Sequence, residues 1–123
     1  MVERKQSDVR RARKESLLYR EVSTYFMQIS QNDPSFSGLF INAVKFSPDK
    51  SSCNIFFAAT GGEEDFKSRL PKLILYKPAI RKAIAQTLQA RYTPQLIFKY
   101  DEQFEKQNKI DTLFEQLKVE GKL

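Results

Sequence analysis

Histidine is absent from this chain of 123 residues, and cysteine occurs once. Histidine is the usual general acid or base near neutral pH and the commonest metal ligand, so its absence argues against most hydrolase and zinc-enzyme functions. One cysteine allows neither an internal disulfide nor a cysteine-cluster metal site. Cys53 lies in an apolar run, where we expect a buried core thiol rather than a reactive one. With no nucleophile-base pair or phosphate loop either, we expect no enzyme, no cofactor and no small-molecule substrate.

Long apolar runs are also missing. No run approaches the roughly 20 residues that a membrane-spanning helix needs. The N-terminus is charged from Glu3 onward and lacks the apolar stretch of a secretory signal. We therefore expect a cytoplasmic protein with no membrane partner. A length of 123 residues with 41% hydrophobic and 29% charged residues is typical of one folded domain.

Acidic residues are missing from one long stretch. Residues 67–100 carry eight Lys or Arg and no Asp or Glu, whereas residues 21–66 carry two basic and six acidic side chains. A second basic group lies in residues 1–20, with seven basic and three acidic side chains. An ordinary solvated surface mixes the two signs. A phosphate-rich partner would explain the bias, because Lys and Arg neutralise phosphates and release condensed counterions. The charge distribution predicts a polyanion partner, bound by one basic face or by two.

The first predicted element is a long amphipathic helix. Apolar side chains recur at three- and four-residue steps from Val9 to Ile29, as in the buried stripe of a helix. Ser7 or Asp8 is the expected N-cap. Asp33-Pro34 is expected to end the helix, because the residue before a proline avoids the helical region. The basic residues near its start oppose the helix dipole, so helix stability does not explain them.

Three strands are expected. Leu39 to Phe46 and Cys53 to Thr60 are β-rich runs separated by turn-forming residues, which predicts an antiparallel hairpin. A third strand is expected from Gln95 to Tyr100, after Pro94.

Two consecutive helices are expected between the second and third strands. Acidic side chains from Glu63 to Asp65 favour a helix start. Pro71 either kinks this helix or lies in the first turn of a shorter one that begins near Ser68. Tyr76-Lys77-Pro78 is predicted to be a sharp joint, and a second helical stripe runs from Ala79 to Arg91.

The last predicted element is an amphipathic helix from about Gln103 to Lys118. We therefore divide the chain into a domain of residues 1–102 and a C-terminal amphipathic helical extension of residues 103–123. The apolar stripe of this helix either packs on its own domain or docks a partner, which includes a second copy of the chain. Its members are Ile110, Leu113, Phe114 and Leu117.

Short motifs stand at defined places in this α-β-β-α-α-β order. They are Asp33-Pro34, Val44-x-x-Ser47-x-Asp49, Ile80-Arg81, Arg91, and Pro94-x-Leu96-x-Phe98-x-x-Asp101. In their order and spacing the chain resembles the ribosome-binding factor A family of bacterial assembly factors. The resemblance implies an α+β fold: a single KH-like domain of type II with a three-stranded sheet, plus a C-terminal helix. It also implies a non-enzymatic, monomeric factor that binds the immature 30S subunit and assists late 16S rRNA maturation.

The chain departs from the family at the joint between the two consecutive helices. The family usually has Ala-x-Gly there, in place of the Gly-x-x-Gly clamp of ordinary KH domains, whereas this chain has Tyr76-Lys77-Pro78. Its only glycines are Gly38, Gly61, Gly62 and Gly121. No glycine therefore lets the backbone approach a phosphate at this joint. Pro78 still suits the first turn of a helix.

Eight basic residues are the candidate RNA contacts. Three stand at the joint, where a helix N-terminus also offers backbone N–H groups to phosphates. The competing interpretations are solvated side chains at the joint, a basic arm of no fixed geometry at the N-terminus, and a helix C-cap at Arg91. The candidates are Arg10, Arg11, Arg13, Lys14, Lys77, Arg81, Lys82 and Arg91.

Five other side chains allow both a functional and a structural interpretation. Tyr76, Tyr92 and Tyr100 either stack on unpaired bases or belong to the core. Asp49 and Asp101 lie at a turn and a helix boundary, so we expect them to accept backbone N–H bonds rather than to act as an acid-base pair.

Three functions remain open from the sequence. The leading hypothesis is an assembly factor of the 30S subunit, in which the charge distribution supports RNA binding and the resemblance supplies the subunit. The second is a generic KH-like protein that binds single-stranded RNA, against which the missing Gly-x-x-Gly argues. The third is a protein-interaction module that acts through the C-terminal helix.

Overall fold

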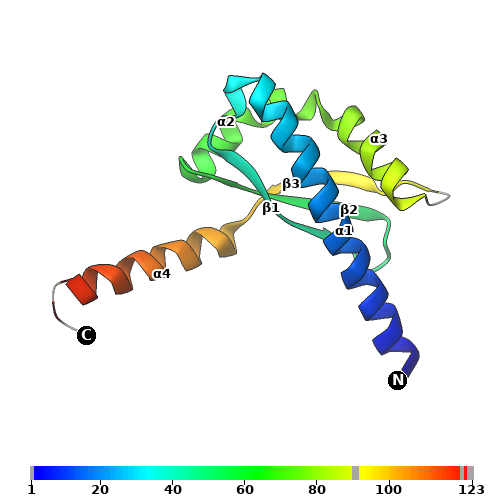
Figure 1. Ribbon diagram of the computed structural model, residues 1–123, viewed down its shortest axis with the longest axis horizontal. Helices are drawn as coiled ribbons and strands as arrows, with labels where there is room; N and C mark the ends of the chain where they lie inside the picture. The colour runs from blue at the N-terminus through cyan, green and yellow to red at the C-terminus, as the bar shows by residue number, and fades with distance from the viewer. Residues whose placement is uncertain (1, 90–91, 120, 122–123) are drawn as a thin grey trace.

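Three strands form one sheet, and three helices pack on one of its faces (Figure 1). The computed structural model describes residues 2–89, 92–119 and 121, with side chains from residue 8 onward. This α+β architecture with a C-terminal helix confirms the predicted order of elements. In chain order they are α1 (Val2–Asn32), the short 3-10 helix η1 (Pro34–Phe36), β1 (Leu39–Phe46), β2 (Ser52–Ala59), α2 (Gly62–Ile74), α3 (Lys77–Leu88), β3 (Gln95–Tyr100) and α4 (Glu102–Val119).

The sheet has the order β1-β2-β3. β1 and β2 pair antiparallel, as the predicted hairpin requires, with a register shift between Ile41 and Ala43. β2 and β3 pair parallel. A parallel pair needs a crossover connection, which α2 and α3 supply. This topology places the joint between α2 and α3 beside β3, at one edge of the sheet, while α1 packs on β1.

The core lies between the sheet and the helices. Leu18, Val22 and Phe26 of α1 meet Ile80 and Ile84 of α3 in one buried cluster. Fully burying such an aliphatic or aromatic side chain contributes about 1.5–3 kcal/mol relative to leaving it exposed. The apolar spacing predicts the core stripe of α3 and that of α1 from Leu18 onward, whereas Val9 and Ala12, at the start of the predicted α1 stripe, are exposed.

Cys53 belongs to this core and is fully buried. Desolvation, together with the negative charge of Glu15, raises the pKa of its thiol to about 12. The prediction of a structural rather than a reactive thiol is confirmed.

The start of α1 differs from the prediction. The helix begins at Val2, not after a cap at Ser7 or Asp8. Residues 3–6 are Glu, Arg, Lys and Gln, which all favour helix, so the helix continues beyond the end of its apolar stripe. Its end is as predicted: Asp33 has an extended backbone with φ −131°, and its side chain accepts a hydrogen bond from the N–H of Ser35.

Pro71 lies inside α2, which runs unbroken from Gly62 to Ile74. The alternative of a shorter helix beginning near Ser68 is therefore wrong. α3 begins at Lys77, two residues before the predicted Ala79, because Pro78 is accommodated in its first turn. It ends at Leu88, where Gln89 adopts a left-handed conformation with φ 50°.

α4 extends away from the sheet as a separate arm (Figure 1). Its first turn touches the domain through Phe104, whose ring lies 5.8 Å from that of Phe40. Beyond that turn three members of the apolar stripe are open, since Ile110, Leu113 and Phe114 are 47%, 56% and 54% exposed, and Leu117 is partly buried. Of the two alternatives for this stripe, packing on its own domain is not observed. None of the described helices has the length and apolar character needed to cross a membrane.

Candidate RNA-binding surface

The joint between α2 and α3 is anchored on Asp33, at the end of α1. The hydroxyl of Tyr76 donates to Asp33 Oδ2 over 3.2 Å, and Lys72 Nζ lies 3.1 Å from the same oxygen. Hydrogen bonds from Ser35, followed by the one from Lys72, lower the pKa of Asp33 to about 2. The ring of Tyr76 also packs edge-on against Phe36. Three segments that are distant in sequence therefore fix the start of α3.

The joint is made without left-handed backbone. Leu75 ends α2 in a right-handed helical conformation, and Tyr76 follows with φ −88° and ψ −3°. The non-glycine residues with positive φ in the described part of the chain are Lys50 and Gln89, neither of which is at the joint. Any residue with a side chain tolerates this geometry, so Tyr76-Lys77-Pro78 needs no glycine. The backbone clamp of ordinary KH domains is replaced here by a short, well-supported turn.

A surface cavity of about 420 Å³ lies between the joint and β3. One side is apolar and the other carries two cations. Lys77 Nζ is 5.6 Å from the centre of the Phe98 ring, a cation–π distance. The guanidinium of Arg81 donates to the carbonyl of Thr93 over 3.4 Å, which directs it towards the start of β3. Lys82, the next residue, is exposed. The cavity is lined by Ile74, Lys77, Pro78, Arg81, Gln95 and Leu96.

The first three cations of the acid-free stretch are neutralised by acids that precede it. Lys67 lies 3.7 Å from Glu63, Arg69 lies 3.0 Å from Asp65, and Lys72 pairs with Asp33. Arg69 also donates to the carbonyl of Ser37.

The later cations of the stretch differ from these. Lys77, Arg81, Lys82 and Lys99 form no ion pair with any residue that the structure describes. The positive charge available to a partner is therefore concentrated at and beyond the joint.

The predicted basic residues of α1 form a second group. They lie on a regular helix, so the alternative of a basic arm without fixed geometry is wrong. Arg11 is partly buried and donates to the carbonyl of Pro48 over 3.0 Å. Glu15 accepts the N–H of Phe46 over 2.7 Å and holds this part of α1 against the end of β1. The exposed members of the group are Arg10, Arg13 and Lys14.

The structure does not bring the two basic groups into one cavity. The α1 group lies beside β1, and the joint group lies beside β3, the opposite edge of the sheet. We therefore distinguish an α1 patch (Arg10, Arg13 and Lys14) from a joint patch (Lys77, Arg81 and Lys82). Arg91 lies outside the described residues.

The tyrosines divide between core and surface. Tyr76 and Tyr100 pack against the core, the latter beside Phe66. Tyr92 is 75% exposed, on the connection between α3 and β3. Of the three tyrosines considered for base stacking, only Tyr92 has a largely exposed side chain.

Asp49 and Asp101 accept backbone hydrogen bonds, as predicted. Asp49 Oδ1 accepts the N–H of Ser51 over 3.1 Å, which stabilises the turn between β1 and β2. Asp101 Oδ1 accepts the N–H of Phe104 over 3.0 Å at the start of α4. Its other oxygen accepts from the amide of Asn42 over 2.6 Å. Within the described ranges, no group of three or more Cys, Asp or Glu side chains is placed to hold a metal.

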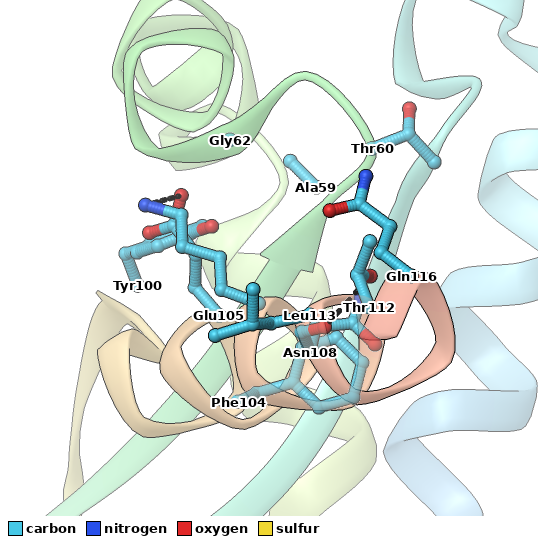
Figure 2. A pocket seen from close by; sticks show the side chains of 11 residues that line it. Ala59, Thr60, Gly62, Tyr100, Phe104, Glu105, Asn108, Thr112, Leu113 and Gln116 are labelled. Carbon is cyan, nitrogen blue, oxygen red and sulfur yellow. Dashed lines mark hydrogen bonds and ion pairs between the residues drawn. The ribbon is translucent and has the colours of Figure 1, made fainter. Parts of the chain in front are cut away.

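A second cavity, of about 490 Å³, lies between α4 and the end of β2 (Figure 2). Its one cation, Lys109, is 3.8 Å from Glu105 on the preceding turn. None of the seven candidate RNA contacts that the structure describes lines it. This cavity therefore adds nothing to the predicted polyanion site.

The family model for ribosome-binding factor A matches residues 10–114. The chain belongs to the ribosome-binding factor A family. The match covers α1 from Arg10, the whole sheet and most of α4. It confirms the resemblance drawn from the short motifs, and this family is described as a ribosome-binding factor rather than as an enzyme.

Individual relatives agree with this assignment. Ribosome-binding factor A of Geobacter metallireducens is 38% identical over 85 residues, which cover 69% of this chain and 72% of the relative. That of Pelobacter propionicus is 34% identical over 89 residues, covering 72% and 73%. The crystal structure of ribosome-binding factor A from Thermus thermophilus matches with a TM-score of 0.60 at 26% identity, covering 72% of this chain and 92% of that one.

The basic residues of the joint patch are predictable from the sequence, but the residues that anchor the joint are not. Asp33 was assigned only to the end of α1, although it also anchors Lys72 and Tyr76. The sequence holds no signal for these contacts, because Lys72 and Tyr76 follow Asp33 by 39 and 43 residues. The apolar wall supplied by Ile74 and Leu96 depends on β3 lying beside α3 and was missed for the same reason.

Proposed function

We propose that this protein is a non-enzymatic ribosome assembly factor that binds the immature 30S subunit and assists late maturation of 16S rRNA. Membership of the ribosome-binding factor A family supports a ribosome-associated role. The charge distribution supports RNA as the component that is bound. In this proposal the protein acts in the cytoplasm as a monomer without a cofactor.

The cavity between the joint and β3 is the observation that carries the proposal. Lys77 and Arg81 line it beside apolar side chains, and neither forms an ion pair with a described residue. Cations at such a cavity bind phosphates, and the apolar wall accepts a base or a ribose. The N-terminal end of α3 adds the favourable end of a helix dipole for an anion.

Recognition by this surface depends on shape rather than on base sequence. Contacts to phosphates position a protein on its nucleic acid but carry no sequence information. The joint is held by Asp33, Phe36 and Tyr76, so its cations are presented in a fixed arrangement. The α1 patch, at the other edge of the sheet, then contacts a second rRNA segment. A folded rRNA junction with two phosphate ridges fits both patches.

Co-sedimentation with 30S, 50S and 70S particles tests the partner and the site together. We expect wild type to sediment with 30S particles, and an Arg81→Glu, Lys82→Glu variant to lose most of this binding. The matched control is Lys106→Glu, Lys118→Glu, which makes the same charge change on exposed positions of α4. Equal binding of wild type to all three fractions would reject the assembly-factor role.

Salt dependence and competition separate the proposal from its alternatives. If about six phosphates are contacted, affinity falls roughly a thousandfold between ~50 and ~200 mM salt. An interaction with 30S particles that is independent of salt contradicts the proposal. If short single-stranded oligonucleotides displace the protein from 30S particles, the result favours the alternative of a generic KH-like RNA-binding protein over the assembly factor.

A further inference from the structure

The face of the sheet opposite the helices carries a second combination of aromatic and basic side chains. Phe56, in the central strand, pairs with Ala43 of β1 and with Lys99 of β3. Residues paired across a sheet share a face, so the Phe56 and Lys99 side chains are neighbours. Lys45 lies two residues along β1 from Ala43, on the same face. These side chains line a cavity of about 440 Å³. We call Lys45, Phe56 and Lys99 the open-face cluster.

This cluster lies outside the core. Ile55 and Phe57 belong to the buried cluster on the other face of β2, and Phe98 of β3 packs against that cluster. α4 covers the open face only at one end, where Phe104 meets Phe40. Phe56 is therefore partly exposed, and the two lysines of the cluster are exposed. Lysines on outer strands often serve only to prevent edge-to-edge association. That role does not require a partly exposed aromatic ring between them.

Two lysines on this face are available to phosphates, and the acidic side chains of the cavity lie together at its α4 end. Neither Lys45 nor Lys99 forms an ion pair with a described residue. Asp101 lines the same cavity, but its two oxygens are occupied by Asn42 and by the N–H of Phe104. Asp101 keeps its negative charge, and Glu102 adds a second carboxylate next to it, at the α4 end of the cavity. A ligand with phosphates therefore lies over the two lysines and away from α4.

Asn54, the cross-strand neighbour of Lys45, carries a buried polar atom without a partner among the residues that the structure describes. Asn54 pairs with Lys45 on one side and with Ile97 on the other. Its carboxamide oxygen is buried and accepts no hydrogen bond in the described part of the chain. Buried polar atoms in folded proteins are nearly always hydrogen-bonded. Because this oxygen is buried and Asn54 does not line the cavity, it is not a contact for the ligand, and the site consists of Phe56, Lys45 and Lys99.

We propose that the open-face cluster binds a single-stranded segment of RNA, with a base on Phe56 and phosphates on Lys45 and Lys99. Stacking on an aromatic ring suits any base, because every base has a π-face. The lysines are on strands two spacings apart, which separates their backbones by about 10 Å and lets them bracket one stacked nucleotide. This site lies on the side of the sheet opposite the joint patch, so the two bind different RNA segments. The inference takes its ligand class from the proposed function but uses none of that function's residues.

Fluorescence anisotropy with a labelled short oligouridylate tests this site in the full chain. We expect Phe56→Leu to weaken binding about tenfold, since it removes the π-face but keeps an apolar side chain, and Phe56→Tyr to retain it. Lys45→Gln, Lys99→Gln should weaken binding by a similar factor and reduce the salt slope by about 2. Glu102→Gln should tighten binding. Lys106→Gln, Lys118→Gln on α4 is the matched charge control and should change nothing. Circular dichroism verifies the fold of each variant.

The Arg81→Glu, Lys82→Glu variant separates this inference from the proposed function. If that variant loses 30S binding but still binds the oligouridylate through Phe56, both hold. If it loses the oligouridylate while the open-face variants bind like wild type, the open-face site is refuted and the proposed function stands. If only the open-face variants lose the oligouridylate and 30S binding survives in Arg81→Glu, Lys82→Glu, the joint patch is refuted and the open-face site stands. Absence of oligouridylate binding by wild type, as expected if this face binds a protein, overturns the inference.

Discussion

Replacing Pro71 by alanine should stabilise the protein. Pro71 lies inside α2, where it provides no N–H to the carbonyl of Lys67, four residues earlier. A proline in a helix interior costs about 3 kcal/mol. Because Pro71 is exposed, alanine leaves no cavity in the core. Alanine gives the unfolded chain more conformational entropy than proline does, which reduces the gain by about 0.4–1 kcal/mol. The gain is reduced further because α2 has already adjusted its backbone to the proline ring. We expect a net gain of about 1–2 kcal/mol.

Urea unfolding followed by circular dichroism measures this effect, and a thermal melt should show a rise of about 4–10 °C. Pro48→Ala is the matched control, since Pro48 lies in an exposed turn and not in a helix. It should be neutral or slightly destabilising, through the unfolded chain alone. An unchanged or lower stability of Pro71→Ala would refute the reasoning and would mean that the ring contributes a contact of its own. Reduced 30S binding by the more stable variant would indicate that the proline sets the angle at which α2 delivers the joint.

The remaining predictions concern acid, thiol chemistry and the C-terminal arm. The pKa values of Asp33 and Asp49 are lowered to about 2, so their contribution to stability is present above about pH 4 and is lost as pH falls towards 2. Acid unfolding curves should show that Asp33→Asn, Asp49→Asn flattens this loss, and an unchanged curve contradicts it. Because burial raises the pKa of the Cys53 thiol to about 12, Cys53 should react with a thiol reagent only at the rate of unfolding. Absorbance assays of the labelling rate in increasing urea measure this. Rapid labelling in buffer argues against the buried position. Removing residues 103–123 should lower stability by about 1–3 kcal/mol, since it removes the packing of Phe104 on Phe40 and the hydrogen bond from the N–H of Phe104 to Asp101. A larger loss in urea unfolding would mean that α4 is an integral part of the domain.

The strands and the core could be predicted because their signals are local. β-rich runs bounded by turn-forming residues identified β1 and β3 to the residue, and apolar spacing identified the buried stripes of α3 and of α1 from Leu18 onward. The start of α1 could not be found in this way. A helix can continue past its apolar stripe whenever the next residues favour helix, and residues 3–6 do.

The candidate site was predicted less completely than the fold, because charge was counted along the chain rather than in space. In the sequence Lys67, Arg69 and Lys72 cannot be told apart from the other cations of the acid-free stretch, but helical spacing and the turn at Asp33 give them acidic partners. Lys99 belongs to the same basic run in sequence, yet it lies on the far face of the sheet beside Phe56. Both differences follow from pairings that depend on the tertiary fold.

The separate arm formed by α4 changes how the size of this protein must be measured. Its 18 residues extend about 27 Å at 1.5 Å per residue, which is comparable to the width of the domain that carries it. An elongated particle migrates in size-exclusion chromatography as if it were heavier than it is. A single copy would then elute close to the position of a compact dimer. The number of copies must therefore come from light scattering or sedimentation equilibrium, and the small-angle scattering profile should lose its long-distance tail when residues 103–123 are removed.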